Sequence, residues 1–294
     1  MLGAAWIARR AVIPAIEASG NGRLVSIASR DPDRAREVAS SHEFVRIAAS
    51  YDAVLDDADV DAVYIPLTND LHRTWTLRAL AAGKHVLCEK PLAMNAVEAR
   101  EMADAAQAAG LHLMEAFMYR FHPRIRALVE SVLDPLYVEA SFGFRLEGRE
   151  NYRFDQSLGG GALLDVGCYT VNVARYILGE PDEVFATWRR ETEDADGVDM
   201  TVSALLHFAS GATASLWASF ESPEDQALLV IDRERTHRLD QPFSAWRDPD
   251  DPYQLMVESF GDSIIDNRTV AIPTSDSVAN MRVLDEIRAV AGAS

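Results

Sequence analysis

The chain is poor in several features that mark whole classes of protein. Its two cysteines, Cys88 and Cys168, have neither metal-ligand spacing nor a disulfide framework, so no metal site is expected and both thiols should be reduced. No apolar run approaches the roughly 18 residues needed to cross a bilayer. The N-terminal charges follow a short apolar stretch, which is the wrong order for a signal peptide. We therefore expect a cytoplasmic protein without membrane partners.

Positive charge is also scarce. The formal net charge is −18, which argues against nucleic-acid binding because such binding needs a basic face. Of the 28 basic residues, only Lys84 and Lys90 are lysines. Lysine can shift its pKa and share a proton, whereas arginine stays charged. A lysine retained in this chain is therefore a candidate for chemistry.

The first 118 residues alternate short apolar runs with amphipathic segments. Strands are expected over residues 24–29, 62–65, 85–88 and 111–115, and helices over 7–18, 33–40, 51–55, 71–82 and 97–109. Strands that alternate with helices of this length indicate βαβ units and a parallel sheet. We therefore predict an α/β domain with a parallel sheet over residues 1–118, which the dinucleotide motif described below would make a Rossmann domain that binds NAD(P).

The pattern changes after about residue 120. A glycine-rich turn at Gly159–Gly161 should open a long helix over residues 162–178. Further strands are expected over 137–144, 184–190, 200–208, 213–220 and 227–232, and helices over 124–132, 253–265 and 277–291. Residues 119–294 thus predict an α+β domain with an open, mainly antiparallel sheet, whose C-terminal helix packs back on the first domain.

Two places look incomplete as elements of such a fold. Only two residues precede Gly3, so the first strand, which should lie at the centre of the sheet, is expected to be almost absent. The stretch Gln241–Pro252 also connects abruptly where another hairpin is expected.

Small residues and a cationic strand tip predict the dinucleotide site. The run from Gly3 to Ala8 has the spacing of the fingerprint G-x-G-x-x-G/A, whose small residues let a backbone approach a pyrophosphate at a helix N-terminus. The next predicted strand ends in Ser29-Arg30-Asp31, with Arg34 one turn on. A hydroxyl and guanidinium groups suit a 2′-phosphate, which favours NADP, while Asp31 leaves NAD possible.

Two further motifs carry groups that could move a proton. Glu89-Lys90-Pro91 follows a predicted strand, and ligands bind beyond the carboxyl ends of the strands in open parallel sheets. Asp165 and Tyr169 are four residues apart on the predicted long helix and therefore share a face. A carboxylate and a phenol on an apolar helix are costly unless they are paired or line a cavity. A surface ion pair and a capped tyrosine are the structural alternatives.

These motifs resemble the family named for glucose–fructose oxidoreductase, inositol dehydrogenase and a rhizopine-catabolism protein (Gfo/Idh/MocA). The resemblance covers nearly the whole chain, and its carriers are GAAWIA, AVYIPLTNDLH, GKHVLCEKP, EAFMYRFHP, GGGALLDVGCY and PYQLMVESF. Many members end the helix motif with histidine. This sequence has Tyr169, as do the glucose–fructose oxidoreductase and dihydrodiol dehydrogenase branches. Ala5 and Ala8 depart from the fullest glycine pattern.

The resemblance implies an NADP-dependent oxidoreductase that moves a hydride between nicotinamide and a CH–OH or C=O carbon of a sugar, polyol or diol. It implies a homodimer or homotetramer built on the free face of the sheet. Tyr169 would be the acid/base and Lys90 its electrostatic partner, and Asp165 would orient substrate hydroxyls or Lys90. Substrate would be bordered by Arg120, His122 and Tyr253, together with Asp165 and Tyr169. The expected cofactor contacts are Gly3, Ala5, Trp6, Ile7, Ser29, Arg30, Arg34, Pro66, Leu67, Thr68, Asn69, His72, Glu89 and Lys90.

Two other functions stay open from the residues alone. One is a non-catalytic regulator that binds NADP, which the presence of Lys90 and Tyr169 disfavours. The other is an NAD-dependent glycosidase, which keeps and recycles its cofactor. The substrate, its stereochemistry and the direction of the reaction are not specified by the sequence.

Overall fold

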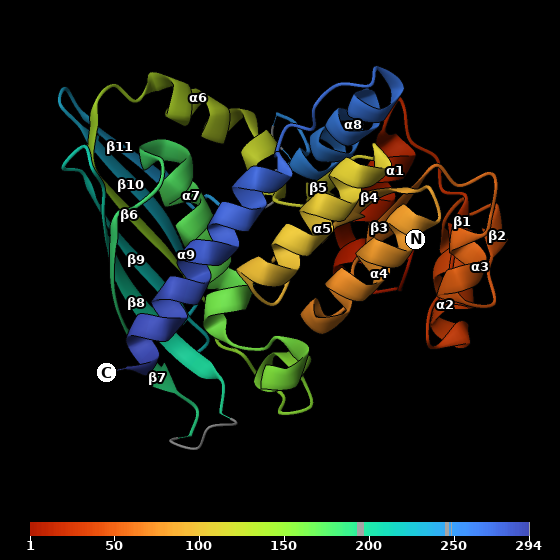
Figure 1. Cartoon of the computed structure of the whole chain (residues 1–294), viewed down its shortest axis with the longest axis horizontal. Coiled ribbons are helices and arrows are strands. Elements are labelled where there is room, and N and C mark those ends of the chain that lie inside the picture. Colours follow the sequence, from red (N-terminus) through yellow and green to blue (C-terminus); the bar gives the residue numbers. More distant parts are fainter. Residues whose placement is uncertain (193–196, 245–246, 248, 294) are drawn as a thin grey trace. The chain divides into compact units, whose positions relative to one another are not determined.

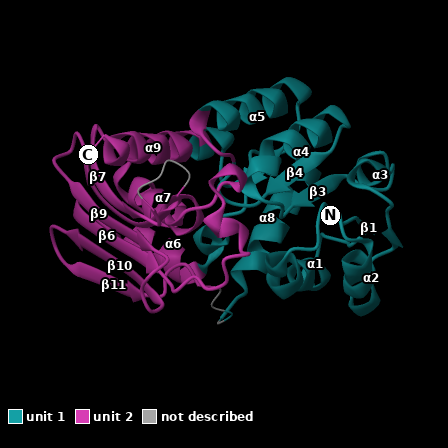
Figure 2. Ribbon diagram, turned by 90° about the horizontal axis from the view of Figure 1, so that it is seen from below, with its two compact units in different colours: residues 1–92, 97–122, 245–277 teal, residues 93–96, 123–244, 278–294 magenta. Residues whose placement is uncertain are grey.

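The computed structural model describes residues 1–192, 197–244, 247 and 249–293. The chain divides into two compact units that are not simply consecutive in sequence (Figure 2). Unit 1 consists of residues 1–92, 97–122 and 245–277, and unit 2 consists of residues 93–96, 123–244 and 278–294. The predicted boundary after residue 118 therefore lies close to the exit from unit 1 at His122, but unit 1 also recruits a later segment.

Unit 1 contains short parallel strands and the helices around them. One sheet has the order β3 (Ala62–Ile65), β4 (His85–Cys88), β5 (Leu113–Glu115), and a second pairs β1 (Ser26–Ile27) with β2 (Arg46–Ile47). The helices are α2 (Pro32–Ser41), α3 (Tyr51–Leu55), α4 (Asn69–Ala81), α5 (Ala96–Ala109), η2 (Met118–Phe121) and α8 (Pro252–Ile265). The parallel pairing agrees with the βαβ alternation in the sequence.

Met1 and Leu2 take the place of the expected first strand. Leu2 forms a parallel bridge with Ala28 and donates its N–H to the carbonyl of Tyr64 over 3.0 Å. The N-terminal ammonium donates to the carbonyl of Ser26 over 2.6 Å, and its burial lowers its pKa to about 5. β1 spans two residues, although a strand was predicted over residues 24–29.

The first helix contains a π-helical segment. The predicted helix over residues 7–18 is observed as η1 (Ala8–Val12), a π-helix, followed by α1 (Ile13–Ala18). Pro14 has no N–H to donate to the preceding turn, so a regular α-helical ladder cannot run through this position. The π-helical segment absorbs that interruption close to the dinucleotide motif.

Unit 2 is built on one mixed sheet covered by helices on one face (Figure 1). Its strand order is β11-β10-β6-β9-β8-β7, and every pairing is antiparallel except the one between β6 and β9. The strands are β6 (Pro135–Gly143), β7 (Glu183–Arg190), β8 (Asp199–His207), β9 (Thr213–Ser219), β10 (Asp225–Asp232) and β11 (Thr236–Asp240). The open, mainly antiparallel sheet was predicted correctly, but β11 was missed because its alternation carries few apolar residues.

The sheet also presents a face that its helices do not cover (Figure 1). Leu205 is 37% exposed, but Phe208 and Leu216 are 5% exposed and lie in the core. Along β9 the buried positions alternate with Ser215 and Trp217, so Leu216 points to the helix-covered side.

The helices of unit 2 are α6 (Pro123–Ser131), α7 (Cys168–Leu178) and α9 (Thr274–Gly292), with the π-helical segment η5 (Leu163–Gly167) before α7. The short 3₁₀ turns η3 (Tyr152–Phe154) and η4 (Gln156–Leu158) precede η5. From Val278 onward α9 groups with unit 2, and α8 is the late helix that belongs to unit 1. The expectation that the final helix packs back on the first domain stays a prediction.

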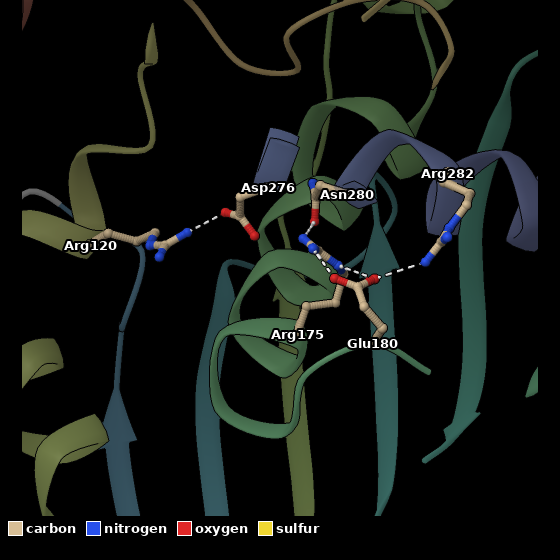
Figure 3. A network of polar contacts seen from close by, with 6 residues as sticks. All are labelled: Arg120, Arg175, Glu180, Asp276, Asn280 and Arg282. Atoms are coloured by element: carbon tan, nitrogen blue, oxygen red, sulfur yellow. Dashed lines mark hydrogen bonds and ion pairs between the residues drawn. The ribbon is translucent and has the colours of Figure 1, made fainter. Parts of the chain in front are cut away.

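A buried arginine ties α9 to α7 within unit 2. Arg175 of α7 donates to Asn280 of α9 over 3.3 Å and forms an ion pair with Glu180, which also accepts from Arg282 (Figure 3). The amide of Asn280 donates in turn to the carbonyl of Cys168. A charge buried in this way is costly unless it is paired. Arg175 therefore has to stay next to Asn280 and Glu180, and this requirement holds α7 and α9 in one relative position.

Candidate active site

The loop that contains Gly3 leaves no space for a larger side chain at this position. Gly3 has φ +108°, and a Cβ atom there would lie 2.9 Å from the Leu67 side chain. The first hydrogen bond of the following helix runs from Arg9 to Ala5, which leaves the earlier N–H groups without intrahelical partners. Ala5 and Ile7 are half-buried, whereas Trp6 is 73% exposed.

The segment that follows β1 carries two exposed arginines and one aspartate that caps a helix. Arg30 and Arg34 are exposed. The Asp31 carboxylate accepts the N–H groups of Asp33 over 3.0 Å and Arg34 over 3.3 Å, so it caps α2. Ser29 accepts the N–H of Asp31 over 3.2 Å. Oδ1 of Asp31 is therefore the acceptor that caps this helix.

Tyr51 joins this tip, and the sequence analysis missed it. Burial raises the pKa of the Tyr51 phenol, while a main-chain hydrogen bond from Arg30 and the charge of Arg30 oppose that rise. Trp75 packs edge-on against the phenol ring at 4.8 Å between ring centroids. Tyr51 carried no motif, since it lies in the five-residue helix α3 and reaches Arg30 only through the fold.

The segment after β3 is organised by a buried histidine. His72 has no exposed surface, and its ring nitrogens lie 2.9 Å from the carbonyl oxygen of Pro91 and 3.1 Å from that of Leu67. Burial lowers the pKa of His72, and the two carbonyl groups oppose this effect. His72 thus links the turn after β3 to the turn after β4. Among the other expected contacts here, Pro66 and Asn69 are buried and Thr68 is half-buried.

The Glu89-Lys90-Pro91 turn follows β4 as predicted, with a cis peptide bond between Lys90 and Pro91. Glu89 is 7% exposed and accepts a hydrogen bond from the Tyr64 hydroxyl over 2.6 Å. The Lys90 N–H lies 3.3 Å from the other Glu89 oxygen. Lys90 itself is half-buried. A buried carboxylate therefore holds the backbone that carries the candidate lysine.

Three residues of unit 1 that were expected to border the substrate are buried or make contacts within the protein. Arg120 forms an ion pair with Asp276 (Figure 3). His122 is 2% exposed, and its N–H donates to the carbonyl of Tyr119. Tyr253 begins α8 and is 7% exposed. A direct role for these residues toward substrate stays a prediction.

In unit 2 the predicted pair lies where the π-helical segment meets α7. Asp165 belongs to η5 and Tyr169 to α7, and they are 6% and 8% exposed. The rings of Phe142 and Phe243 lie 5.5 and 5.4 Å from the Tyr169 ring, measured between centroids. π-Helical segments of this kind are frequent at functional sites. The phenol is therefore held in a largely apolar setting beside one carboxylate.

A residue that the sequence analysis did not single out completes this half of the site. Arg153 of η3 donates through Nε to Oδ2 of Asp165 over 2.6 Å. Burial would lower the pKa of Arg153, but the Asp165 carboxylate and the Tyr152 and Tyr169 hydroxyls keep it above its usual value. No spacing rule connects Arg153 with Asp165, because the contact depends on the path of the loop between them.

The described residues contain no group of three or more histidine, cysteine or acidic side chains that could hold a metal ion. They also contain no helix long and apolar enough to cross a membrane. The arginines of unit 1 can bind anions, and Lys90 and Tyr169 are side chains that can take part in proton transfer.

Two family models match the chain. Residues 1–117 match the model "Oxidoreductase family, NAD-binding Rossmann fold", and residues 124–236 match the model of the GFO/IDH/MocA C-terminal domain. The chain belongs to the Gfo/Idh/MocA oxidoreductase family. The predicted family and the predicted fold class are both confirmed.

Named relatives place the chain among sugar and diol oxidoreductases. It is 41% identical over 311 residues to D-xylose 1-dehydrogenase (NADP(+)) 2 of Haloferax volcanii, covering 98% of this chain and 95% of the relative. It is 38% identical over 216 residues to trans-1,2-dihydrobenzene-1,2-diol dehydrogenase of Sus scrofa, covering 71% and 63%. The crystal structure of aldose-aldose oxidoreductase from Caulobacter crescentus, complexed with glycerol, aligns with a TM-score of 0.93 at 26% identity, covering 99% and 96%.

Proposed function

We propose that this protein is an NADP-dependent oxidoreductase that transfers hydride between the nicotinamide and a CH–OH or C=O carbon of a neutral sugar, polyol or diol. The observation that carries the proposal is the buried Asp165–Tyr169 pair, which offers a positioned proton-transfer group in an enzyme family built around a Rossmann domain. The relatives act on a pentose and on a cyclic diol by name, and a third is complexed with a polyol.

The residues of unit 1 suit NADP. Gly3 has φ +108°, a conformation that L side chains rarely adopt, and it stands at the first small position of the dinucleotide fingerprint, where the tight turn needs glycine. Arg30 and Arg34 would bind the 2′-phosphate, with Ser29 beside them, because guanidinium groups form charge-assisted hydrogen bonds to phosphate. The competing reading, NAD held by Asp31, is disfavoured because that carboxylate already caps α2. When bound, the cofactor would supply the hydride acceptor or donor.

The protein's own groups would handle the proton. Alcohol oxidation requires a base for the hydroxyl proton, and a free phenol with a pKa near 10 is a poor base at neutral pH. We assign Tyr169 as this acid/base and Lys90 as the cation that lowers its pKa. Asp165 would accept hydrogen bonds from substrate hydroxyls. Lys90 and Tyr169 belong to different units, so measurements on a double variant decide whether they serve one step.

The first experiment is a panel of pentoses, hexoses and diols assayed with NADP⁺ and NAD⁺ at the absorbance of the reduced cofactor. Turnover of at least one compound with net formation of NADPH is the expected result. Binding of NADPH without any turnover would identify a regulator. Hydrolysis of a glycoside without net reduction would identify a glycosidase. A cytoplasmic location and a dimer or tetramer remain predictions.

A further inference from the structure

Arg153 lies against the two residues that the proposed function needs in unit 2. Its Nε atom donates to Asp165 over 2.6 Å, and Asp165 lies four residues before Tyr169, across the junction of η5 and α7. The Arg153 side chain is 28% exposed, and that of Asp165 is 8% exposed. A carboxylate buried to this degree needs a partner to stay ionised.

The glycine-rich turn holds Arg153 in position. Gly161 donates its N–H to the carbonyl oxygen of Arg153 over 3.0 Å, and a Cβ atom on Gly160 would lie 2.5 Å from that same oxygen. Asn151 caps the other side by accepting the Arg153 N–H over 3.1 Å. The Gly159–Gly161 motif therefore does more than begin a helix. It lets the backbone pass close to Arg153 where the loop returns to the start of η5.

The Tyr152 ring restrains the guanidinium further. It lies 4.9 Å from the Arg153 guanidinium carbon, measured to the ring centroid, which is within the range of cation–π contacts. The arginine is therefore held by its backbone, by the carboxylate and by an aromatic ring. Such restraint is typical of a side chain that orients another group.

We propose that Arg153 is a positioning residue of the active site, which keeps Asp165 ionised and oriented and favours the phenolate form of Tyr169. The inference rests on the proposed function through the proton-transfer role of Tyr169. Among the described residues of unit 2, Asp165 from η5 and Arg153 from η3 bring charges to this part of the site, while β6 and the segment after β11 contribute the uncharged rings of Phe142 and Phe243. The cation proposed from unit 1 is Lys90. Because the guanidinium and the carboxylate compensate each other, they also suit neutral hydroxyl-bearing substrates better than sugar acids.

The test is a spectrophotometric titration of the Tyr169 phenolate, obtained as the difference between a protein and its Tyr169→Phe derivative. Arg153→Gln keeps a hydrogen-bond donor for Asp165 but removes the charge. It should move the titration midpoint up by about one pH unit or more, as expected for loss of a cation beside a phenol. Arg149→Gln is the matched control, since Arg149 lies four residues earlier on the same loop and is 78% exposed. It should leave the midpoint unchanged.

A second comparison covers the case in which Arg153→Gln alone does not fold. In the Asp165→Asn background no carboxylate is left unpaired, so adding Arg153→Gln isolates the effect of the guanidinium. The same upward shift is expected there. An unchanged midpoint in the folded variant, in either background, would overturn the proposal.

The titration needs no substrate, so its outcome is separate from that of the proposed function. If the unmutated protein turns over no compound of the panel, the function fails while the titration still decides the role of Arg153. If turnover is intact and the midpoint does not move, only the role of Arg153 fails. With a substrate in hand, the rate–pH profile of alcohol oxidation in Arg153→Gln should shift upward by the same amount as the titration.

Discussion

The hydroxyl of Tyr64 donates to Oε1 of Glu89 over 2.6 Å, and both side chains are buried in unit 1. Burial and the neighbouring Glu89 charge raise the pKa of Tyr64 well above its usual value, so the phenol stays a donor. The contact fixes the carboxylate next to Lys90. A residue that the sequence shows only as part of a strand thus supports the candidate lysine.

Tyr64→Phe should destabilise the protein by about 1–3 kcal/mol, because the buried Glu89 carboxylate loses the hydrogen bond to its Oε1 atom. Chemical denaturation monitored by circular dichroism measures the loss. Tyr137→Phe is the control, since Tyr137 also donates to a carboxylate, Glu139, but in an exposed setting. The control should change stability by no more than about 0.5 kcal/mol. Equal effects of the two substitutions would show that burial of the Tyr64–Glu89 pair is unimportant.

Arg30→Ala should weaken NADPH binding by about 1.5–3 kcal/mol and leave NADH binding nearly unchanged, because only NADPH carries the 2′-phosphate. Fluorescence titration with both cofactors measures this. Arg36→Ala on the following helix α2 is a suitable control, since Arg36 pairs with Asp33 and is 62% exposed. Equal affinities of the unmutated protein for NADPH and NADH would contradict the assignment of the strand tip.

Tyr169→Phe should lower turnover by about 10²–10⁴-fold, the usual contribution of general acid–base catalysis, while cofactor binding persists. Lys90→Ala should also lose rate, and its remaining activity should move to higher pH. The two losses should not add, because both residues serve one proton transfer. Near-full turnover in Tyr169→Phe would make the tyrosine structural. If Lys90→Ala were inactive at the same time, the acid/base role would pass to Lys90.

Asp199 should make stability depend on pH in an unusual direction. Burial raises its pKa from 3.8 to about 6, although it accepts the Leu163 N–H over 2.6 Å. Between about pH 6 and pH 4 the folded state then binds a proton that the unfolded state does not, so this group's contribution to stability increases as pH falls. Above pH 6 its charge costs up to about 3 kcal/mol.

Asp199→Asn keeps an acceptor for Leu163 and removes the titration. The difference in unfolding free energy between the protein and this variant should therefore change between pH 4 and 6 and be flat above pH 7. Denaturation curves at several pH values measure it. A difference independent of pH would show that the pKa of Asp199 is not raised.

We expect a dimer or tetramer assembled on the uncovered face of the unit 2 sheet. Phe185 is 51% exposed and Leu205 is 37% exposed on that face, and exposed apolar groups gathered on one surface often mark interfaces. Leu205→Arg should yield a smaller species in light scattering at micromolar concentration. Val97→Arg is the control, because Val97 is 78% exposed on α5 of the other unit. An unmutated protein that is already monomeric would exclude this assembly.

Local patterns were enough to predict the classes of element and the positions of the main motifs. Apolar runs of four residues, as in β3 and β4, alternate with amphipathic segments, and this alternation indicates parallel strands. Glu89, Lys90, Asp165 and Tyr169 were predicted because a charged or phenolic group at a strand end or on an apolar helix is visible in sequence. Short β11, with alternating exposure and few apolar residues, gave no comparable signal.

Only the tertiary structure decided which groups meet. The sequence left open whether the Asp31 carboxylate caps a helix, and in the fold one of its oxygens caps α2. Arg153 reaches Asp165 because Gly160 and Gly161 let the loop return upon itself, a contact that depends on backbone dihedral angles and not on residue spacing. The sequence shows which chemical groups stand within a few residues of each other along the chain. Contacts between distant side chains depend on how segments pack, because hydrogen bonds act only over a few ångströms.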